Sequence, residues 1–576
     1  MILDLIHNEV KKALTQIENT DSSKLDIVVA TNNKFGDFQT NVALQHAKIL
    51  RKKPLDIAQD IADRLQSSPL FSKVEIANPG FINISIDTQT INSLLTDMSS
   101  CQYNGISQTK SNETIIIDYS SPNVAKTMHV AHLRSTIIGD ALKRIYKACG
   151  YNALGDNHIG DWGTQFGKIL YAYKNFEHPT DIEKDSVAML EKIYQEFTQK
   201  AEEDSTLDDY ARQELVSLQK KEEPNYSLWK KFISISLKEF HRVYKRLDIT
   251  FDMENGESFY NDNLQGIIDQ LQSKKLCQES KGAQVVFFED DKYPPCLVQK
   301  NDGSFLYATT DLATVFHRQN KLNANKAIYV TDNRQKLHFQ QFFHISELMG
   351  KDYELEHVMF GLMKFGEGTV MSTRKGAVIS LQFLLDEAEK RAFDVILDRD
   401  YSEEEKKEIA RVVGIGAIKY QDLSQNPMTD ITFTWEKALN LEGNSAPYLQ
   451  YAYARAQSIH RKFVETFPDH DLKSSKYCID FVDGGSSKET IEKELALHIL
   501  MYGHAVHHAK NQNKPNLIAD YLYQLSSKFS SFYNQVPILK EESQSKRGSL
   551  ILLSDLCAKT LKDGLNLLGI ETLERM

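Results

Sequence analysis

The side chains best suited to chemistry are two histidines three residues apart, His129 and His132, with Lys126 just before them. They follow an apolar run and a polar loop, and they precede apolar residues at helical spacing. The first turn of a helix offers unpaired N–H groups and the positive end of the helix dipole, which suit phosphate oxygens. Two imidazoles on one side of that turn could donate hydrogen bonds to a phosphate as charge builds on it. A chance surface pair, or half of a metal site, is the alternative interpretation.

A buried strand and a helix are predicted on either side of this pair. Residues 115–117 are three isoleucines in a row, which is typical of a strand buried on both faces of a parallel sheet. A polar loop spans residues 118–123, and apolar residues recur at helical spacing from Leu133 to Cys149, with Gly150 as a natural stop. Strand, loop and helix in this order open a nucleotide-binding α/β unit.

Two long segments here resemble signature segments of arginyl-tRNA synthetases, which are class I aminoacyl-tRNA synthetases. One runs from Asp118 to Asp140 and contains His-Val-Ala-His in the place of the class I HIGH motif. The other, residues 157–167, reads Asn-His-Ile-Gly-Asp-Trp-Gly-Thr-Gln-Phe-Gly. The resemblance implies a Rossmann-type catalytic domain and ATP as a substrate. The implied ATP-binding residues are His129, Ala131, His132, Gly160, Asp161, Met371 and Ser372.

Ala131 departs from the family pattern, in which a glycine usually stands between the histidines. There the missing side chain lets the adenine ring lie against the backbone, so a methyl group could crowd the base. We expect the base to lie slightly further out, because the neighbouring residues fit the pattern.

A glycine-bounded basic loop, residues 366–376, is a second candidate for phosphate contact. Arg374 and Lys375 could close on a triphosphate; a basic surface turn is the alternative. The loop resembles the class I KMSKS motif, reading Val-Met-Ser-Thr-Arg at residues 370–374, without the two lysines of that motif. In the family a lysine before the first histidine is thought to supply the lost charge, and Lys126 matches it. The resemblance leaves open which of these cations meets the pyrophosphate, and it implies as catalytic residues His129, His132, Lys126, Arg374 and Lys375.

Substrate selection is expected to rest on carboxylates. An arginine side chain presents a planar, permanently charged fork, which carboxylates in its plane can grip. Asp118 ends the first predicted strand, where ligands of parallel sheets bind. Asp311 lies near the first turn of a predicted helix, where a helix N-cap is its alternative role. By resemblance, Asp118, Asp311 and Tyr307 bind the guanidinium and Asn123 holds the amino acid backbone. The implied arginine-binding residues are Asp118, Ser121, Asn123, Tyr307, Asp311 and Gln335.

The resemblance also implies a two-step reaction without a protein nucleophile. The arginine carboxylate attacks the α-phosphorus of ATP and expels pyrophosphate, and the terminal ribose hydroxyl of tRNA(Arg) then attacks the arginyl-adenylate and releases AMP. Positioning and charge stabilisation supply the catalysis. Mg²⁺ is expected on the phosphates, and bound tRNA is expected to be needed even for the first step.

The C-terminal third is predicted to be helical, with Tyr448, Tyr451 and Arg455 on one helix face. Aromatic rings and an arginine on one face can stack unpaired RNA bases; a buried aromatic stripe is the alternative. The segment 444–455 resembles the anticodon-binding domain of arginyl-tRNA synthetases. The chain ends Glu-Arg-Met as many members do, which implies that Met576 lies near the anticodon.

The first 110 residues are predicted to form a small α+β unit, with helices over residues 2–17 and 41–50 and a strand over residues 80–86. Residues 36–41 are similar to the family's N-terminal domain, which touches the outer corner of tRNA. The match is short, and it suggests as contacts only Phe38, Gln39 and Asn41.

These patterns predict a multidomain α/β protein. It would have a small N-terminal α+β domain, a Rossmann-type parallel-sheet domain with a charged helical insertion, and an all-α anticodon-binding domain. The sheet is expected to resume at two strand-like runs, residues 285–288 and 327–330. The expected boundaries are 1–110, 111–370 (insertion about 175–265), 371–440 for the signature loop and stem contact, and 441–576.

Composition agrees with a cytoplasmic protein. With 41% hydrophobic and 26% charged residues the chain is an ordinary globular one, and no apolar run approaches the ~20 residues of a membrane span. The net charge of −11 means that only local patches can hold nucleic acid. The six cysteines are far apart and form no Cys-x-x-Cys pair, which indicates free thiols and no protein-held metal. By resemblance we expect a monomer.

Two other classes of function stay open. A nucleotidyltransferase could use the same histidine pair to adenylylate a small molecule, and turnover without tRNA would favour it. A non-catalytic RNA-binding relative is the other, although the intact histidines and acids argue against it. Cysteine-specific relatives would need zinc ligands that are absent here.

Overall fold

The fold is that of a computed structural model, which describes residues 2–17, 20, 25–30, 32–178, 185–289, 292–351, 353–366, 379–469, 472 and 487–576. The N-terminal unit is a four-stranded antiparallel sheet, in the order β1-β2-β4-β3, with helices packed against it. This confirms the predicted α+β unit. Its elements are α1 (Ile2–Thr15), β1 (Ile27–Val29), β2 (Phe38–Thr40), α2 (Val42–Leu50), α3 (Pro54–Leu65), β3 (Phe71–Ala77), β4 (Phe81–Ile86) and α4 (Thr88–Ser100).

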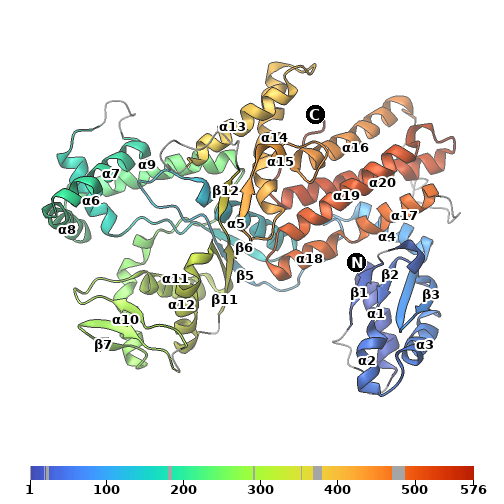
Figure 1. The fold of residues 1–576 in the computed structure, drawn as a ribbon, viewed down its shortest axis with the longest axis horizontal. Helices are drawn as coiled ribbons and strands as arrows, with labels where there is room; N and C mark the ends of the chain where they lie inside the picture. The colour runs from blue at the N-terminus through green and yellow to red at the C-terminus, as the bar shows by residue number, and fades with distance from the viewer. Residues whose placement is uncertain are drawn as a thin grey trace.

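A four-stranded parallel sheet, in the order β11-β10-β5-β6, forms the centre of the molecule (Figure 1). The predicted isoleucine strand is β5, and all five of its residues are buried, as a strand covered on both faces requires. The predicted helix after it is α5, whose buried face packs on β5 and β10. The elements are β5 (Thr114–Asp118), α5 (Val130–Ala148), β6 (Asn152–Asp156), β10 (Ala324–Asp332), α12 (Lys336–Leu348) and β11 (Glu354–Phe360).

The strand order reverses between β5 and β10. The chain leaves β5 through α5 toward β6 on one side, and it leaves β10 through α12 toward β11 on the other. Ligands of such sheets bind at the carboxyl ends of the strands at the point of reversal. Asp118 is the last residue of β5 and therefore lies at that point.

One predicted strand belongs to a different sheet. Residues 285–288 were expected to continue the parallel sheet, but β8 pairs antiparallel with its two neighbours in a separate three-stranded sheet. A short apolar run does not reveal its pairing partner, which explains the error. This region contains α10 (Leu264–Ser273), β7 (Gln278–Ser280), β8 (Ala283–Val286), β9 (Cys296–Gln299) and α11 (Tyr307–Leu322).

The predicted helical insertion is four helices that enclose their own apolar core, which includes Phe166, Ile193 and Phe232. Its outer surface carries the charged residues, but its longest helix, α9, also reaches the active-site loop through Ser236 and Tyr244. The helices are α6 (Thr164–Asn175), α7 (Val187–Glu203), α8 (Thr206–Gln219) and α9 (Asn225–Arg246).

Helices make up most of the described chain after the sheet. Two short parallel strands and a pair of packed helices lead from the sheet: β12 (Met363–Phe365), α13 (Leu381–Ile396), α14 (Glu403–Leu423), β13 (Ile431–Phe433) and α15 (Trp435–Ala438). The predicted all-α region follows as α16 (Ala446–Thr466), α17 (Ser487–Leu500), α18 (Tyr502–Gln512), α19 (Asn516–Gln535) and α20 (Gln544–Leu567).

A buried lysine joins the central and C-terminal parts. Lys419 on α14 is 1% exposed, and its Nζ donates to the backbone carbonyls of Leu247, just after α9, and of Gly569, just after α20, the latter at 2.6 Å. Burial lowers the pKa of Lys419 to about 8.

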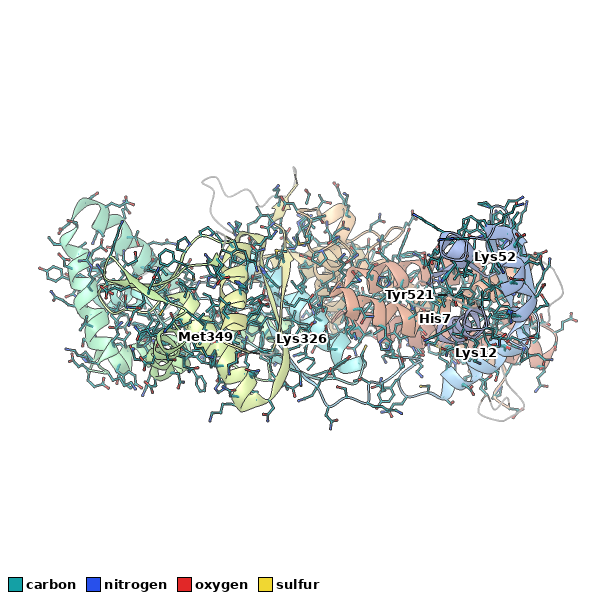
Figure 2. The ribbon with its side chains drawn as sticks, turned by 90° about the horizontal axis from the view of Figure 1, so that it is seen from below. His7, Lys12, Lys52, Lys326, Met349 and Tyr521 are labelled. Carbon is teal, nitrogen blue, oxygen red and sulfur yellow. The ribbon has the colours of Figure 1, made fainter. Side chains whose placement is uncertain are left out.

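The molecule is elongated. The insertion helices lie at one end, the N-terminal unit at the other, and the parallel sheet between them (Figure 1). Figure 2 shows the same order from below, with Lys326 on the central sheet and Lys52 in the N-terminal unit. The N-terminal unit contacts α17, and Lys493 pairs with Asp37 at 3.0 Å. None of the described helices combines the length and the apolar character that crossing a membrane requires.

Candidate active site

The loop between β5 and α5 is held in an unusual backbone conformation. Ser120, Ser121 and Ala125 have φ values of 71°, 48° and 62°, a region that side-chain-bearing residues rarely occupy and that is concentrated at functional sites. Each backbone N–H donates to a side chain from a neighbouring element: Ser120 to Ser135 Oγ at 2.9 Å, Ser121 to Asn157 Oδ1 at 3.1 Å and Ala125 to Ser236 Oγ at 2.9 Å. The surrounding elements therefore impose the loop shape.

The two histidines cap α5. His129 is the N-cap, and its Nδ1 accepts from the backbone N–H of Ala131 at 3.2 Å, while Nδ1 of His132 accepts from the N–H of His129 at 3.2 Å. Their ring centroids are 4.1 Å apart. A neutral imidazole that accepts at Nδ1 carries its proton on Nε2, so each ring keeps one N–H donor.

Both imidazoles are held neutral. Burial lowers the pKa of His129, and burial followed by the neighbouring His129 lowers the pKa of His132 to about 3. The charge of the Lys126 ammonium lowers both pKa values further, so this side chain lies near the two rings. Nζ of Lys126 lies 5.5 Å from the ring centroid of Tyr194 on α7. Ala131 is exposed on the same first turn.

Gly160 packs against Asn123, which was predicted to hold the substrate backbone. Their segments form a parallel bridge, in which Val124 N–H donates to the Gly160 carbonyl at 3.0 Å. A Cβ at residue 160 would lie 2.2 Å from Asn123 Oδ1. Glycine is therefore required here because any side chain would displace Asn123.

Asp161, predicted as an ATP-binding residue, has its carboxylate occupied by a neighbouring turn. Its oxygens accept from Ser258 N–H at 2.8 Å and from Ser258 Oγ at 2.6 Å. Its side chain also fills the space where a Cβ of Gly256 would lie. Its visible effect is to hold residues 256–258 in place.

Helix α11 carries two of the predicted arginine ligands on one face. Tyr307 begins the helix and is 69% exposed, and Asp311 follows one turn later. The N-cap is Leu306, so the alternative role of Asp311 as a helix cap is wrong. Asp311 Oδ2 instead lies 2.5 Å from His338 Nε2, and despite burial this carboxylate raises the pKa of His338. Gln335 is exposed at the start of α12.

Glu257 is a site residue that the sequence reasoning missed. Burial, then the charges of Asp311 and Asp161, raise its pKa to about 8. Burial and then the charges of Glu257 and Asp311 also raise the pKa of the Tyr307 hydroxyl, and residues 257–263 pack against α11, so the three side chains lie near one another. Glu257 lies in a short segment between the insertion and α10, where no periodic pattern distinguishes it from other surface acids.

Asp118 is at the predicted place but is not a free carboxylate. Its Oδ2 accepts from Arg318 Nη2 at 2.5 Å and its Oδ1 from Ser121 Oγ at 3.2 Å. Arg318 belongs to the same helix as Asp311, so the predicted pair Asp118 and Asp311 is linked through α11, and one oxygen of Asp118 is already paired with the chain's own guanidinium. Glu257 lies near Asp311, whose own partner is His338.

Residues 367–376 of the basic loop that resembles the KMSKS motif, called the signature loop below, lie outside the described residues, and with them the candidates Met371, Ser372, Arg374 and Lys375. The residues that follow it pair with the histidine turn: Val130 N–H donates to the Ile379 carbonyl at 3.2 Å, and Leu381 N–H to the Met128 carbonyl at 2.8 Å. The chain thus returns from the loop directly beside His129.

A cavity of about 790 Å³ lies on the predicted RNA-binding helix face. The guanidinium of Arg455 lies 4.7 Å from the ring centroid of Tyr451 and 4.8 Å from that of Tyr533, and both rings are about two-fifths exposed. Met576 lines the same cavity. Tyr448 is half-buried instead, and its hydroxyl lies 3.3 Å from Ser530 Oγ. Tyr533, from α19, was missed because it is remote in sequence.

In the N-terminal unit one suggested tRNA contact is wrong. Phe38 is 1% exposed and packs in the core, since its strand position faces inward. Gln39 faces outward and donates to Asn83 Oδ1 at 2.7 Å, and Asn41 is the N-cap of α2. Phe35, at 44% exposure, is the aromatic side chain that this segment offers to a partner.

In the part of the chain that the structure describes, no three His, Cys, Asp or Glu side chains lie close enough together to bind a metal ion. The five described cysteines are free thiols, as expected, and Cys478 lies outside the described residues.

Family models match this chain along most of its length. The model for the class I (R) tRNA synthetase catalytic domain matches residues 90–435, the arginyl tRNA synthetase N terminal domain residues 4–86, and the DALR anticodon binding domain residues 449–576.

Similar proteins cover the whole chain. An arginine–tRNA ligase of Fusobacterium nucleatum is 45% identical over 97% of this chain and 96% of its own, and one of Synechocystis is 42% identical over 96% and 95%. The arginyl-tRNA synthetase of Plasmodium falciparum has a TM-score of 0.82 at 29% identity over 99% of this chain and 97% of its own. That of Thermus thermophilus shares the fold, with a TM-score of 0.83 at 23% identity over all of both chains.

Proposed function

The chain belongs to the class I arginyl-tRNA synthetases and ligates L-arginine to tRNA(Arg) with ATP, and we propose the roles that its own residues take in this reaction. The observation that supports these roles best is one juxtaposition at the carboxyl edge of the sheet. The neutral imidazoles of His129 and His132, each with an Nε2–H donor, lie at the N-terminus of α5. Glu257 and Asp311 lie near each other, where the charge of Asp311 adds to burial in raising the pKa of Glu257. The two histidines suit phosphate oxygens, and Glu257 with Asp311 suits the planar, positively charged guanidinium group.

Glu257 and Asp311 grip the substrate guanidinium, with Tyr307 beside it. Burial and then the charge of Asp311 raise the pKa of Glu257, and a cation that enters between the two side chains offsets that charge. The planar guanidinium can bond both at once, which a lysine ammonium cannot do in the same geometry. Citrulline is neutral and would not supply the positive charge that favours the ionised form of Glu257.

Asn123 and Ser121 hold the amino and carboxylate end of arginine, and Gln335 closes the pocket. The imposed loop conformation and the contact of Asn123 with Gly160 support this role, because they fix the Asn123 amide at the strand ends. Asp118 contributes by holding Ser121 rather than by gripping the substrate fork.

Activation is an in-line displacement. One oxygen of the arginine carboxylate forms a bond to the α-phosphorus while the bond from that phosphorus to the bridging oxygen breaks, and pyrophosphate leaves with the electron pair. His129 and His132 donate Nε2–H to phosphate oxygens, and Lys126 adds positive charge. Arg374 and Lys375 are proposed to reach the pyrophosphate from the signature loop. Ala131 and Gly160 face the nucleotide, with Met371 and Ser372 completing its site.

Transfer follows when a terminal ribose hydroxyl of tRNA(Arg) attacks the carbonyl carbon of the adenylate and AMP leaves. We propose that anticodon bases stack in the cavity of Tyr451, Arg455 and Tyr533, with Met576 on its wall. Phe35 and Gln39 of the N-terminal unit are proposed to meet the outer corner of the tRNA.

Mg²⁺ would enter with the phosphates of ATP. The donors at the histidine turn are N–H groups and an ammonium, which fit anions rather than metals. We also propose a cytoplasmic monomer, which the free thiols support. The four regions bounded at residues 110, 370 and 440 would then correspond to outer-corner contact, activation, stem contact and anticodon binding.

Exchange of labelled pyrophosphate into ATP tests the proposal when it is measured over the twenty amino acids, with and without tRNA(Arg). Arginine alone should support exchange, and only with tRNA present. Exchange with another amino acid would overturn the assigned pocket, and exchange without tRNA would favour a small-molecule nucleotidyltransferase.

A further inference from the structure

A fully buried guanidinium of the chain itself lies beneath the arginine pocket. Arg318 is 0% exposed and follows Tyr307 and Asp311 on α11 at spacings of eleven and seven residues, which place the three on one helix face. Its Nη2 donates to Asp118 Oδ2 at 2.5 Å and to Asp156 Oδ2 at 2.7 Å, and its Nε donates to Asp156 Oδ2 at 3.2 Å.

The two carboxylates end neighbouring strands in register. Asp118 closes β5, Asp156 closes β6, and the two are paired across the parallel ladder. Tyr329 on β10 is paired with Asp118 on the other side, and its ring centroid lies 5.2 Å from the Arg318 guanidinium carbon. Two carboxylates and an aromatic face are the surroundings that a selective guanidinium site requires.

Arg318 is also linked to the loop between β5 and α5, residues 119–129, which is called the nucleotide loop here. Asp118 accepts at its second oxygen from Ser121 Oγ, and Ser121 occupies one of the left-handed positions of that loop. Asp118 thereby connects the guanidinium on the arginine-pocket helix to the loop that leads to His129.

We propose that Arg318 is a positioning and specificity-determining residue. Its guanidinium occupies the carboxylates of Asp118 and Asp156, so the substrate guanidinium is directed to Glu257 and Asp311 instead. Through the same contacts Arg318 fixes α11 relative to the nucleotide loop. The inference rests on the proposed function and deepens it. It explains why the Asp118 and Asp156 carboxylates are occupied by the chain itself, which leaves Glu257 and Asp311 for the substrate. With Arg318 removed, Asp118 and Asp156 would become a second cation site and Ser121 would lose its fixed acceptor.

The test compares Arg318→Lys, Arg318→Met and the double variant Arg318→Met/Asp156→Asn with the wild type. In the double variant the loss of the Asp156 negative charge offsets the loss of the Arg318 positive charge, so the net charge of the cluster is that of the wild type but the guanidinium is absent. Pyrophosphate exchange with tRNA(Arg) gives kcat and KM for arginine and ATP separately, and thermal melting checks folding. We expect Arg318→Met to lower kcat/KM for arginine by about 100-fold, the scale of a misplaced reacting group. The double variant should recover at least tenfold of that loss, and Arg318→Lys should lie between.

Chemical rescue separates positioning from a general loss of stability. In Arg318→Ala, millimolar guanidinium should restore exchange at least tenfold, whereas the neutral urea, of nearly the same shape, should not. Wild type and an exposed control, Lys230→Ala, should respond to neither. Arg318 variants that fold and keep kcat and both KM values within twofold of the wild type would overturn the inference, as would equal rescue by urea. If Arg318→Ala fails to fold, the lysine and double variants decide. An inactive wild type would instead count against the proposed function.

Discussion

His132 Nδ1 accepts a hydrogen bond from the backbone N–H of His129 at 3.2 Å, so the ring proton of His132 is on Nε2. An asparagine at residue 132 can reproduce the acceptor near Nδ1, and a glutamine can reproduce a donor near Nε2. If donation to phosphate is the catalytic role, we expect His132→Asn to fold but lose about 10²- to 10³-fold in kcat for pyrophosphate exchange, with His132→Gln less impaired. The reverse order would mean that the cap, not the donor, matters.

Arginine binding should depend on pH through Glu257. Its pKa is raised to about 8 by burial, Asp311 and Asp161, so it is mostly protonated at neutral pH in the free protein. A bound guanidinium favours the ionised form, so binding should release a proton, and affinity should rise by up to about tenfold per pH unit up to about pH 8. Calorimetry in two buffers of different ionisation enthalpy measures the released proton. Glu257→Gln should bind more weakly and release none; a wild-type affinity that is constant from about pH 6 to about pH 8 would contradict the assignment.

Lys126 should matter for activation. Because its ammonium lowers the pKa of both histidines, it lies where it can also meet phosphate charge. We expect Lys126→Ala to reduce arginine-dependent pyrophosphate exchange by about 10²-fold or more. Lys230→Ala, an exposed lysine of α9, is the matched control and should keep wild-type exchange. Wild-type exchange in Lys126→Ala would assign the charge to the signature loop instead.

Ala131→Gly tests the departure in the histidine motif. Ala131 is exposed in the first turn of α5, so its methyl group faces the site rather than the core. We expect the KM for ATP to stay unchanged or to fall, with a loss of unfolding free energy of up to about 1 kcal/mol. Steady-state kinetics and thermal melting measure the two effects. A large increase in the KM for ATP would show that the methyl group is part of the adenine contact.

Arg455→Ala should weaken tRNA binding. The guanidinium lies between the rings of Tyr451 and Tyr533, so its removal leaves both rings without their common partner. Loss of one stacking contact is worth about 1–3 kcal/mol, and we expect the KM for tRNA(Arg) to rise by about 5- to 150-fold with the KM for arginine unchanged. Arg461→Ala, on the same cavity wall but away from the rings, is the control. An equal effect in both variants would indicate general charge rather than stacking.

The sequence patterns predicted the elements well and the side-chain partners poorly. The isoleucine run of β5 and the periodicity of α5 are local signals, and the parallel sheet and histidine turn followed from them. Phe38 was mistaken for a surface ring because a short strand does not reveal which face is buried. Glu257, His338 and Arg318 act through partners more than 25 residues away in the sequence, which no local pattern encodes.

The buried Lys419 has a consequence for motion. Its ammonium has two carbonyl acceptors, one just after α9 and one just after α20, and it would be left unsatisfied if either helix end withdrew. We therefore expect the C-terminal ends of α9 and α20 to move together as one rigid body. Helix α9 supports the nucleotide loop, and the segment after α20 leads to the anticodon cavity. A rearrangement on tRNA binding would then be a rigid-body rotation of this unit, without a displacement of α9 relative to α20.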